Sequence, residues 1–158
     1  MKSRIDKVDR AILECLIEDA RMQCSEIARR LGYITPRAVR NRLRKLVDDG
    51  FISITAGARP EKLGFAISAD IAIDVEPGMT QQVAHRLVDL DEVIYVALTT
   101  GDTDVSASVV VVSMGALQTF ISEKLHTIPG VRKTRTYVLT RVLKQSCDWP
   151  FPEMLPEL

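Results

Sequence analysis

The pattern of apolar and polar positions changes once along the chain, near residue 65. Before that point, apolar residues recur every three or four positions, as they do on one face of an amphipathic helix. Beyond it, residues 65–75 alternate between apolar and polar side chains, which is typical of a half-buried strand. The pattern therefore predicts a helical amino-terminal part, followed by a part that contains a sheet.

Three helices are predicted before residue 50. The first spans residues 6–19. The second begins at Cys24 and ends at Gly32, and after a three-residue turn a third begins at Pro36, with Thr35 placed to cap its free backbone N–H groups. The expected apolar stripes are Ile5, Val8, Ala11, Ile12, Cys15 and Leu16 on the first helix, and Val39, Leu43, Leu46 and Val47 on the third. Two helices joined by so short a turn form the helix-turn-helix pattern.

The side of the third helix opposite its apolar stripe is basic. The candidate DNA-contacting residues there are Thr35, Pro36, Arg37, Arg40, Asn41, Arg44 and Lys45. An arginine can bind a guanine edge or a phosphate, and the sequence leaves both open, whereas the amide of Asn41 suits an adenine edge. Arg29 and Arg30 are expected to contact phosphate or solvent, and Arg42 to turn toward the domain's own surface. The plain alternative is a solvated charged face.

The charge of the chain is unevenly distributed. Overall, 21 Lys and Arg balance 21 Asp and Glu, but residues 1–60 hold 13 basic and 8 acidic residues, and residues 61–158 hold 8 and 13. A basic module gains affinity for duplex DNA by releasing counterions, while an acidic remainder is repelled by it. We therefore expect residues 1–60 to bind DNA, with residues 51–55 forming a short strand and residues 51–64 serving as a wing or linker.

The second part is predicted to be an α+β unit over residues 65–144. Its expected elements are a strand at 65–75, a helix at 79–90, a strand at 93–98, a turn-rich loop at 99–104, a strand at 105–112, a helix that Ser113 caps and Pro129-Gly130 ends, and a strand at 131–143. This order is a split βαβ, or ferredoxin-like, arrangement whose two helices cover one face of the sheet.

The other face of that sheet needs a cover of its own. Val109 to Val112 place apolar side chains on both faces, so we expect a second copy of the chain to bury the face without helices. The amino-terminal domain or a local cover is the alternative. The tail, residues 145–158, contains prolines and large apolar groups, and either straps onto a neighbouring subunit or is frayed.

Several function classes find no support in the sequence. No apolar run is long enough for a membrane span and no signal peptide is evident, which favours a cytoplasmic protein. Three cysteines without CxxC spacing and two histidines, His85 and His126, provide no metal set, and no cofactor is expected. Nucleotide-binding, zinc-protease and hydrolase motifs are absent from the sequence.

Motifs along nearly the whole chain resemble one family. They are Asp9-Arg-Ala-Ile-Leu13, Glu26-Ile-Ala-Arg-Arg-Leu-Gly32, Arg42-Leu-Arg-Lys-Leu46, Gly50-Phe-Ile52, Lys62-Leu-Gly64, Thr100-Gly-Asp-Thr-Asp104 and Pro129-Gly-Val131. Their order and spacing resemble the Lrp/AsnC, or feast/famine, family of bacterial and archaeal transcription regulators. The resemblance implies a winged helix-turn-helix followed by a RAM-type ligand-sensing domain. It also implies dimers that gather into octamers, bind operator DNA and respond to an amino acid or related metabolite.

The resemblance also implies a ligand site. Gly101, Asp102 and Asp104 match the family's Gly-Asp-x-Asp loop, which borders a small-ligand pocket between dimers, so the candidate ligand-binding residues are Thr99, Thr100, Gly101, Asp102, Asp104, Thr134 and Thr136. Two positions depart from the family pattern: Thr103 replaces a common aromatic residue, and Gln23 a small hydroxyl residue. An architectural DNA-binding protein without an effector is the alternative, and a haem-precursor decarboxylase-like enzyme is a more distant one.

Overall fold

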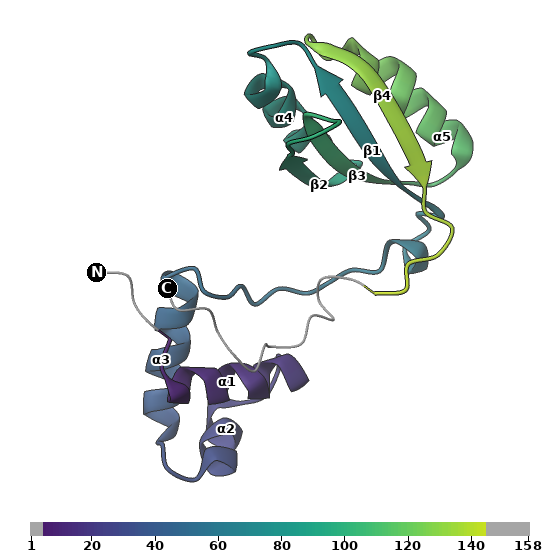
Figure 1. Cartoon of the computed structure of the whole chain (residues 1–158). Coiled ribbons are helices and arrows are strands. Elements are labelled where there is room, and N and C mark those ends of the chain that lie inside the picture. The colour runs from purple at the N-terminus through teal and green to yellow at the C-terminus, as the bar shows by residue number, and fades with distance from the viewer. Residues whose placement is uncertain (1–4, 145–158) are drawn as a thin grey trace. The chain divides into compact units, whose positions relative to one another are not determined.

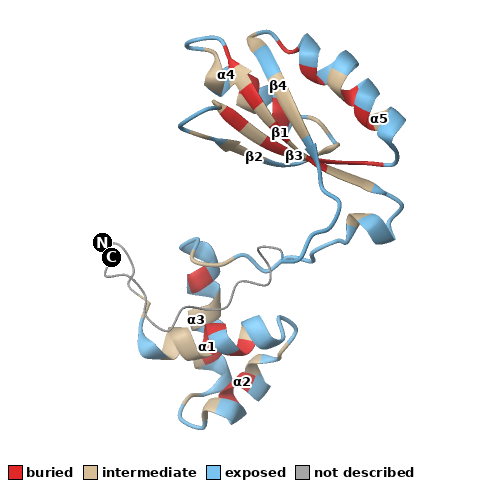
Figure 2. Ribbon diagram, turned by 45° about the vertical axis from the view of Figure 1, so that its right-hand side comes forward, coloured by how far each residue is buried: buried red, intermediate tan, exposed pale blue. Residues whose placement is uncertain are grey.

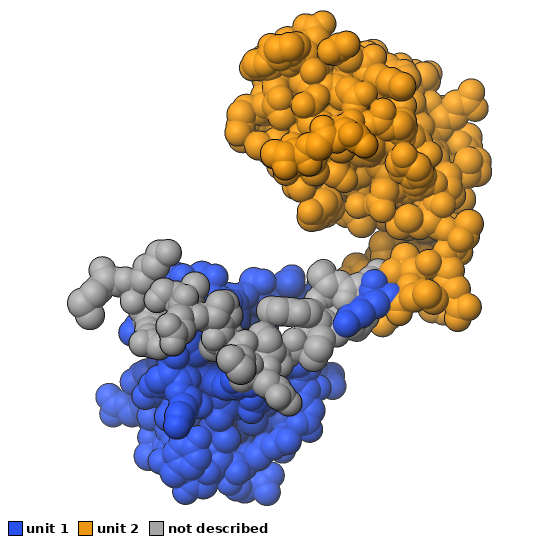
Figure 3. Space-filling model, in the orientation of Figure 1, with its two compact units in different colours: residues 1–57, 144–158 blue, residues 58–143 orange. Residues whose placement is uncertain are grey.

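The structure is a computed structural model that describes residues 5–144. The described residues divide into two compact units, one that holds the amino-terminal helices and extends to Gly57, and one that runs from Ala58 to Leu143 (Figure 3). The tail at residues 145–158, with its expected strap, lies outside the described residues. None of the described helices has the length and apolar composition needed to cross a membrane.

The amino-terminal unit contains, in its described part, helices α1 (Lys7–Glu18), α2 (Cys24–Leu31) and α3 (Pro36–Asp48) (Figure 1). The predicted punctuation is present. Gly32 ends α2 with a left-handed φ of 75°, a conformation that glycine adopts without steric cost, and the Thr35 hydroxyl accepts from the Ala38 N–H at 3.2 Å. Gln23 precedes α2 without a side-chain cap.

A small core joins these helices. Ile12 and Cys15 of α1, Ile27 and Ala28 of α2, and Val39 of α3 are buried together. Two details of the expected stripes differ. Leu13 is also buried, whereas Val47, expected in the core, is 41% exposed. The reason is geometric: Val39 and Leu46 are seven residues apart and define the buried side of α3, and Val47 lies one further step of about 100° around the helix.

The strand expected at residues 51–55 does not form. Residues 51–59 contain no helix or strand, and the next element is a 3₁₀ turn at Pro60–Lys62. Phe51 and Ile52 instead donate their backbone N–H groups to the Leu46 carbonyl at the end of α3. Since an isolated strand has no partner for its backbone groups, the apolar run alone could not produce a wing here.

The second unit has the predicted α+β order. Its elements are β1 (Ile67–Val75), α4 (Thr80–Val88), β2 (Val93–Leu98), β3 (Val105–Val111), α5 (Met114–Thr119), which continues through a π turn (Phe120–Lys124) and a 3₁₀ turn (Leu125–Thr127), and β4 (Val131–Val138). In residues 58–143, these strands form one antiparallel sheet in the order β2-β3-β1-β4. The last strand ends at Val138 rather than at residue 143, because its partner β1 begins at Ile67 and Val138 is already opposite Ala69.

Helices α4 and α5 cover one face of this sheet (Figure 1). The core beneath them includes Ile71 and Ile73 of β1, Val109 of β3, Leu87 of α4 and Leu117 of α5. Figure 2 shows buried segments in red along β1 and β3 and on parts of α4 and α5. The alternation predicted for β1 is confirmed, since Ala69, Ile71, Ile73 and Val75 are buried.

We call the opposite side the helix-free face. Of the valines expected to contribute to it, Val110 is 6% exposed, whereas Val112, one residue beyond the end of β3, is 59% exposed. The register places Tyr95, Ser108, Asp70 and Tyr137 in one row across all four strands. The two tyrosines, at opposite edges of the row, are 56% and 57% exposed.

Candidate functional site

The exposed side of α3 carries a basic surface. Arg37, Arg40, Asn41, Arg44 and Lys45 are all exposed, and within the described part of the chain none of their side chains is engaged in a hydrogen bond or ion pair. Thr35 and Pro36 form the first turn of the same helix, where backbone N–H groups begin to point outward. The cationic side chains of α3 are therefore exposed to solvent and accessible to a polyanion.

The other arginines of this unit behave differently. Arg42 binds Asp6 and Asp9 at the start of α1, with its Nη1 2.6 Å from Asp6 Oδ2 and 2.8 Å from Asp9 Oδ1. It therefore turns toward the domain's own surface, as expected. Arg30 pairs with Glu18 at 2.6 Å, and Arg29 approaches Glu26 at 3.5 Å. The pairing with Asp9 and Asp6 raises the pKa of Arg42 above its ordinary value.

A second candidate site lies in the other unit, around the loop between β2 and β3. A cavity of about 510 Å³ is lined by Asp74, Gly101, Asp102, Thr103, Asp104, Arg132 and Lys133. Its lining thus contains carboxylates and cations together. The loop residues Gly101, Asp102 and Asp104, singled out by the sequence, are brought to this cavity.

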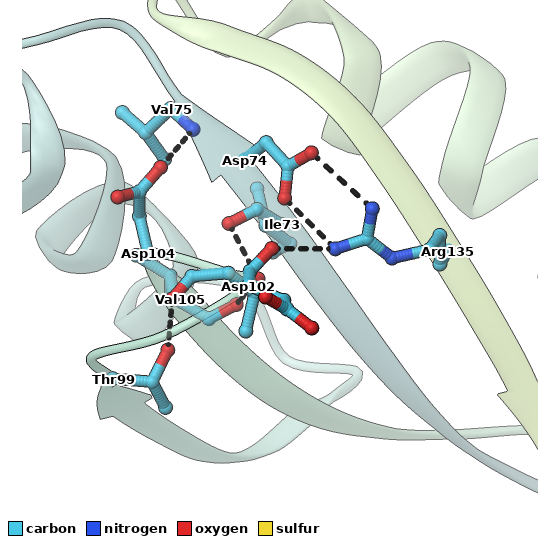
Figure 4. Close-up of polar contacts among 9 residues, drawn as sticks. Ile73, Asp74, Val75, Thr99, Asp102, Asp104, Val105 and Arg135 are labelled. Carbon is cyan, nitrogen blue, oxygen red and sulfur yellow. Dashed lines mark hydrogen bonds and ion pairs between the residues drawn. The ribbon is translucent and has the colours of Figure 1, made fainter.

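Hydrogen bonds hold the loop in place (Figure 4). Asp104 accepts from the Val75 N–H at 2.7 Å, and its own N–H donates to the Ile73 carbonyl. The Thr103 hydroxyl donates to the same carbonyl at 2.9 Å, and the Thr99 hydroxyl donates to the Thr103 carbonyl at 2.7 Å. Asp104 and Thr99 therefore fix the loop's shape, while the exposed Asp102 carboxylate remains available to a ligand.

Arg135 links the loop to the sheet. Its guanidinium binds Asp74 of β1, with Nη2 3.0 Å from Oδ1, and the same Nη2 donates to the Asp102 carbonyl at 2.8 Å (Figure 4). Arg135 reaches this carbonyl from β4, 33 residues further along the chain. Arg135 of the sheet thus fixes the backbone of Asp102, while the side-chain carboxylate of Asp102 stays exposed.

The structure does not bring Thr134 and Thr136 to this cavity. Both are paired with residues of the helix-covered face, Thr134 with Ile73 and Thr136 with Ile71, and Thr134 bonds His126. The alternate residues Lys133 and Arg135 occupy the other face. Sequence reasoning missed Arg132, Lys133, Arg135 and Asp74. The alternation along β4 could have separated the two faces, but not the register that sets β4 beside β1.

Comparison with known proteins assigns both units. Residues 5–53 match the model for a winged helix-turn-helix DNA-binding domain, and residues 68–149 match the model for the Lrp/AsnC ligand-binding domain. The chain belongs to the Lrp/AsnC family. It is 42% identical over 144 residues, 90% of each chain, to an uncharacterised HTH-type transcriptional regulator of Pyrococcus abyssi.

Solved structures of this family share the fold. Escherichia coli AsnC matches with a TM-score of 0.83 and 28% identity, covering 90% of this chain and 97% of that one. A feast or famine regulatory protein of Mycobacterium tuberculosis, solved in complex with L-methionine, matches with the same TM-score, identity and coverage. The chain is therefore an HTH-type, DNA-binding transcriptional regulator of the Lrp/AsnC type and not an enzyme.

Asp104 holds the loop by a hydrogen bond, whereas the Asp102 carboxylate is exposed, and this difference gives a first prediction. Asp104→Ala removes the acceptor of the Val75 N–H and should lower the free energy of unfolding by about 1–3 kcal/mol, the usual cost of leaving a partly buried donor unsatisfied. Asp102→Ala removes an exposed carboxylate and should change it by less than about 0.5 kcal/mol. Chemical denaturation measures both, and equal effects would contradict the assignment.

Proposed function

We propose that α3 enters the major groove of operator DNA and reads it with Arg37, Arg40, Asn41 and Arg44, while Lys45 and the first turn at Thr35 and Pro36 contact the backbone. The observation that carries this proposal is the contrast within one helix: Arg42 is paired internally, whereas the cations on the opposite side have no partner among the described residues. Cations left unpaired on one side of a helix that fits the major groove are suited to phosphates and guanine edges.

The working particle is a homodimer that gathers into an octamer, with two copies of α3 reading the halves of a pseudo-palindrome. The row Tyr95, Ser108, Asp70 and Tyr137 supports the helix-free face as the contact between copies, because it offers two half-exposed aromatic rings on either side of two smaller side chains. The neighbouring row, Ala97, Ser106, Ala72 and Arg135, is also small in its first three members and allows close approach.

The effector is a zwitterionic amino acid or a related metabolite held at the 99–104 loop. Support comes from the charges around the cavity, where Asp102 suits an ammonium group and Arg132 or Lys133 a carboxylate. The related M. tuberculosis regulator, whose structure contains L-methionine, supports the same class of ligand. An effector changes DNA binding only if it binds two assembly states unequally.

Removing one reading arginine tests the assignment of α3. Arg40→Ala should weaken binding to a selected operator by about 1–3 kcal/mol if the side chain contacts a base. The matched control is Arg86→Ala, which removes an exposed cation from α4 in the other unit and should leave the affinity nearly unchanged. Fluorescence anisotropy measures both, and equal affinities and footprints would refute the role of Arg40.

Sedimentation tests the assembly. The protein should sediment as a dimer or a larger particle at micromolar concentration, and joint Tyr95→Lys and Tyr137→Lys substitution should shift it toward smaller species, because like charges would meet across the face. Tyr33→Lys, on an exposed tyrosine between α2 and α3, is the control. A stable wild-type monomer would contradict the dimer, and unaltered variants would place the contact elsewhere.

A thermal-shift screen tests the effector. At least one of the standard amino acids or their keto acids should raise the melting temperature, because a ligand that binds only the folded state stabilises it. Asp102→Asn should reduce that shift and leave DNA binding without ligand intact, while Asp89→Asn, an exposed carboxylate after α4, should leave the shift unchanged. No shift with any compound would favour an effector-independent architectural protein.

A further inference from the structure

The ion pairs between Arg42 and the start of α1 join segments far apart in sequence. Asp6 and Asp9 lie 36 and 33 residues before Arg42, and both bonds leave from the same guanidinium nitrogen. The Asp9 side chain is 14% exposed and that of Arg42 36%, so this contact is partly withdrawn from water. Screening by solvent and salt is weaker there than for a surface pair.

The carboxylates of Asp6 and Asp9 each bind the start of α1 through one oxygen and α3 through the other. Asp6 Oδ1 accepts from the N–H groups of Val8 and Asp9, both at 2.8 Å, and Asp9 Oδ2 accepts from the Asp6 N–H at 3.1 Å, which completes a capping box. The remaining oxygens, Asp6 Oδ2 and Asp9 Oδ1, bind Arg42. The group that holds the first turn of α1 therefore also holds the middle of α3.

Protonation energetics agree with this arrangement. Burial alone would raise the pKa of Asp6, but the hydrogen bonds from the Asp9 N–H, Arg42 and the Val8 N–H outweigh it and lower the pKa below its ordinary value. Asp6 thus accepts its hydrogen bonds in its charged form. A fixed charged cluster resists rotation of α3 about its axis more than apolar contacts alone, which are not directional.

Arg42 lies on the wrong side of α3 to read DNA together with its neighbours. It shares the side that contains the buried Val39 and Leu46, three and four residues away, whereas Arg37, Arg40 and Arg44 recur on the opposite side. A hollow of about 370 Å³ beside it is lined by Asp6, Asp9, Asn41, Arg42 and Lys45. The ion-paired cluster of Asp6, Asp9 and Arg42 therefore lies next to Asn41 and Lys45, at the border of the basic surface, but is not part of that surface.

We propose that Arg42 is a positioning residue, which uses the capping box of α1 to fix the rotation of α3 so that its basic side meets the duplex in register. The proposal rests on the proposed role of α3 in reading DNA. It makes two acidic residues beside a DNA-binding surface favourable for DNA binding. Removing a negative charge from such a surface ordinarily increases affinity for a polyanion. If Arg42 positions α3, neutralising Asp9 should instead decrease the affinity for DNA.

The experiment measures Kd by fluorescence anisotropy at several salt concentrations, using the full chain and a duplex that the wild type selects from a random library. Arg42→Gln and Asp9→Asn should each weaken binding about three- to tenfold, and together no more than either alone, as expected for partners in one contact. Their salt slopes should stay at the wild-type value, because neither change removes a phosphate contact. Arg42→Lys, which keeps the charge, should recover part of the loss.

Two controls separate the possible failures. Asp48→Asn removes an exposed carboxylate at the end of α3 and should leave affinity equal or slightly higher. Arg44→Ala should weaken binding and reduce the salt slope by about 1 if it contacts a phosphate. Melting curves identify any variant that fails to fold; if Arg42→Gln does, Asp9→Asn and Arg42→Lys still decide the matter.

Tighter binding by Asp9→Asn, or a reduced salt slope for Arg42→Gln, would overturn the positioning role. The second result would instead make Arg42 a direct phosphate contact. If Arg37→Ala, Arg40→Ala and Arg44→Ala all leave affinity unchanged, α3 is not the reading helix and the proposed function itself fails, whatever the Arg42 variants do.

Discussion

The amino-terminal unit depends on one constraint: α3 must be fixed to the rest of the unit on one side, while the cationic side chains on its other side stay unpaired. Val39 and Leu46 bury the held side, and Arg42 adds a directional contact to α1. The cations on the opposite side form no ion pair with the described residues, so nothing there offsets their mutual repulsion. A surface that is costly to the isolated protein becomes favourable when an external polyanion neutralises it.

The second unit solves a related problem with a sheet. The apolar residues of β1 and β3 are buried under α4 and α5, which leaves the charged and polar groups on the helix-free face and at the 99–104 loop. Arg135 ties that loop to β1 through Asp74 and the Asp102 carbonyl. Any ligand that competes for these charges therefore acts on a segment connected directly to the sheet and to its proposed contact with a second copy.

Local signals predicted most of the fold. The Gly32 turn, the Thr35 cap and the alternation of β1 each depend on a few neighbouring residues, and all were found as expected. Two of the failures involve partners distant in sequence: residues 51–55 look like a strand but lack a partner, and β4 ends near the start of its antiparallel partner β1. The third is local, because Val47 lies one step around α3 from its buried side. At the loop, Gly101 and Asp102 were predictable, but Asp74 and Arg135 required the strand register.

A structure of the full chain bound to a duplex that it selects would show directly whether α3 reads DNA. We expect α3 to lie in the major groove, with Arg40 and Arg44 within hydrogen-bond distance of bases or phosphates and Arg42 still bound to Asp6 and Asp9. DNA bound to another surface, or Arg42 released from α1 and turned toward a phosphate, would contradict this expectation.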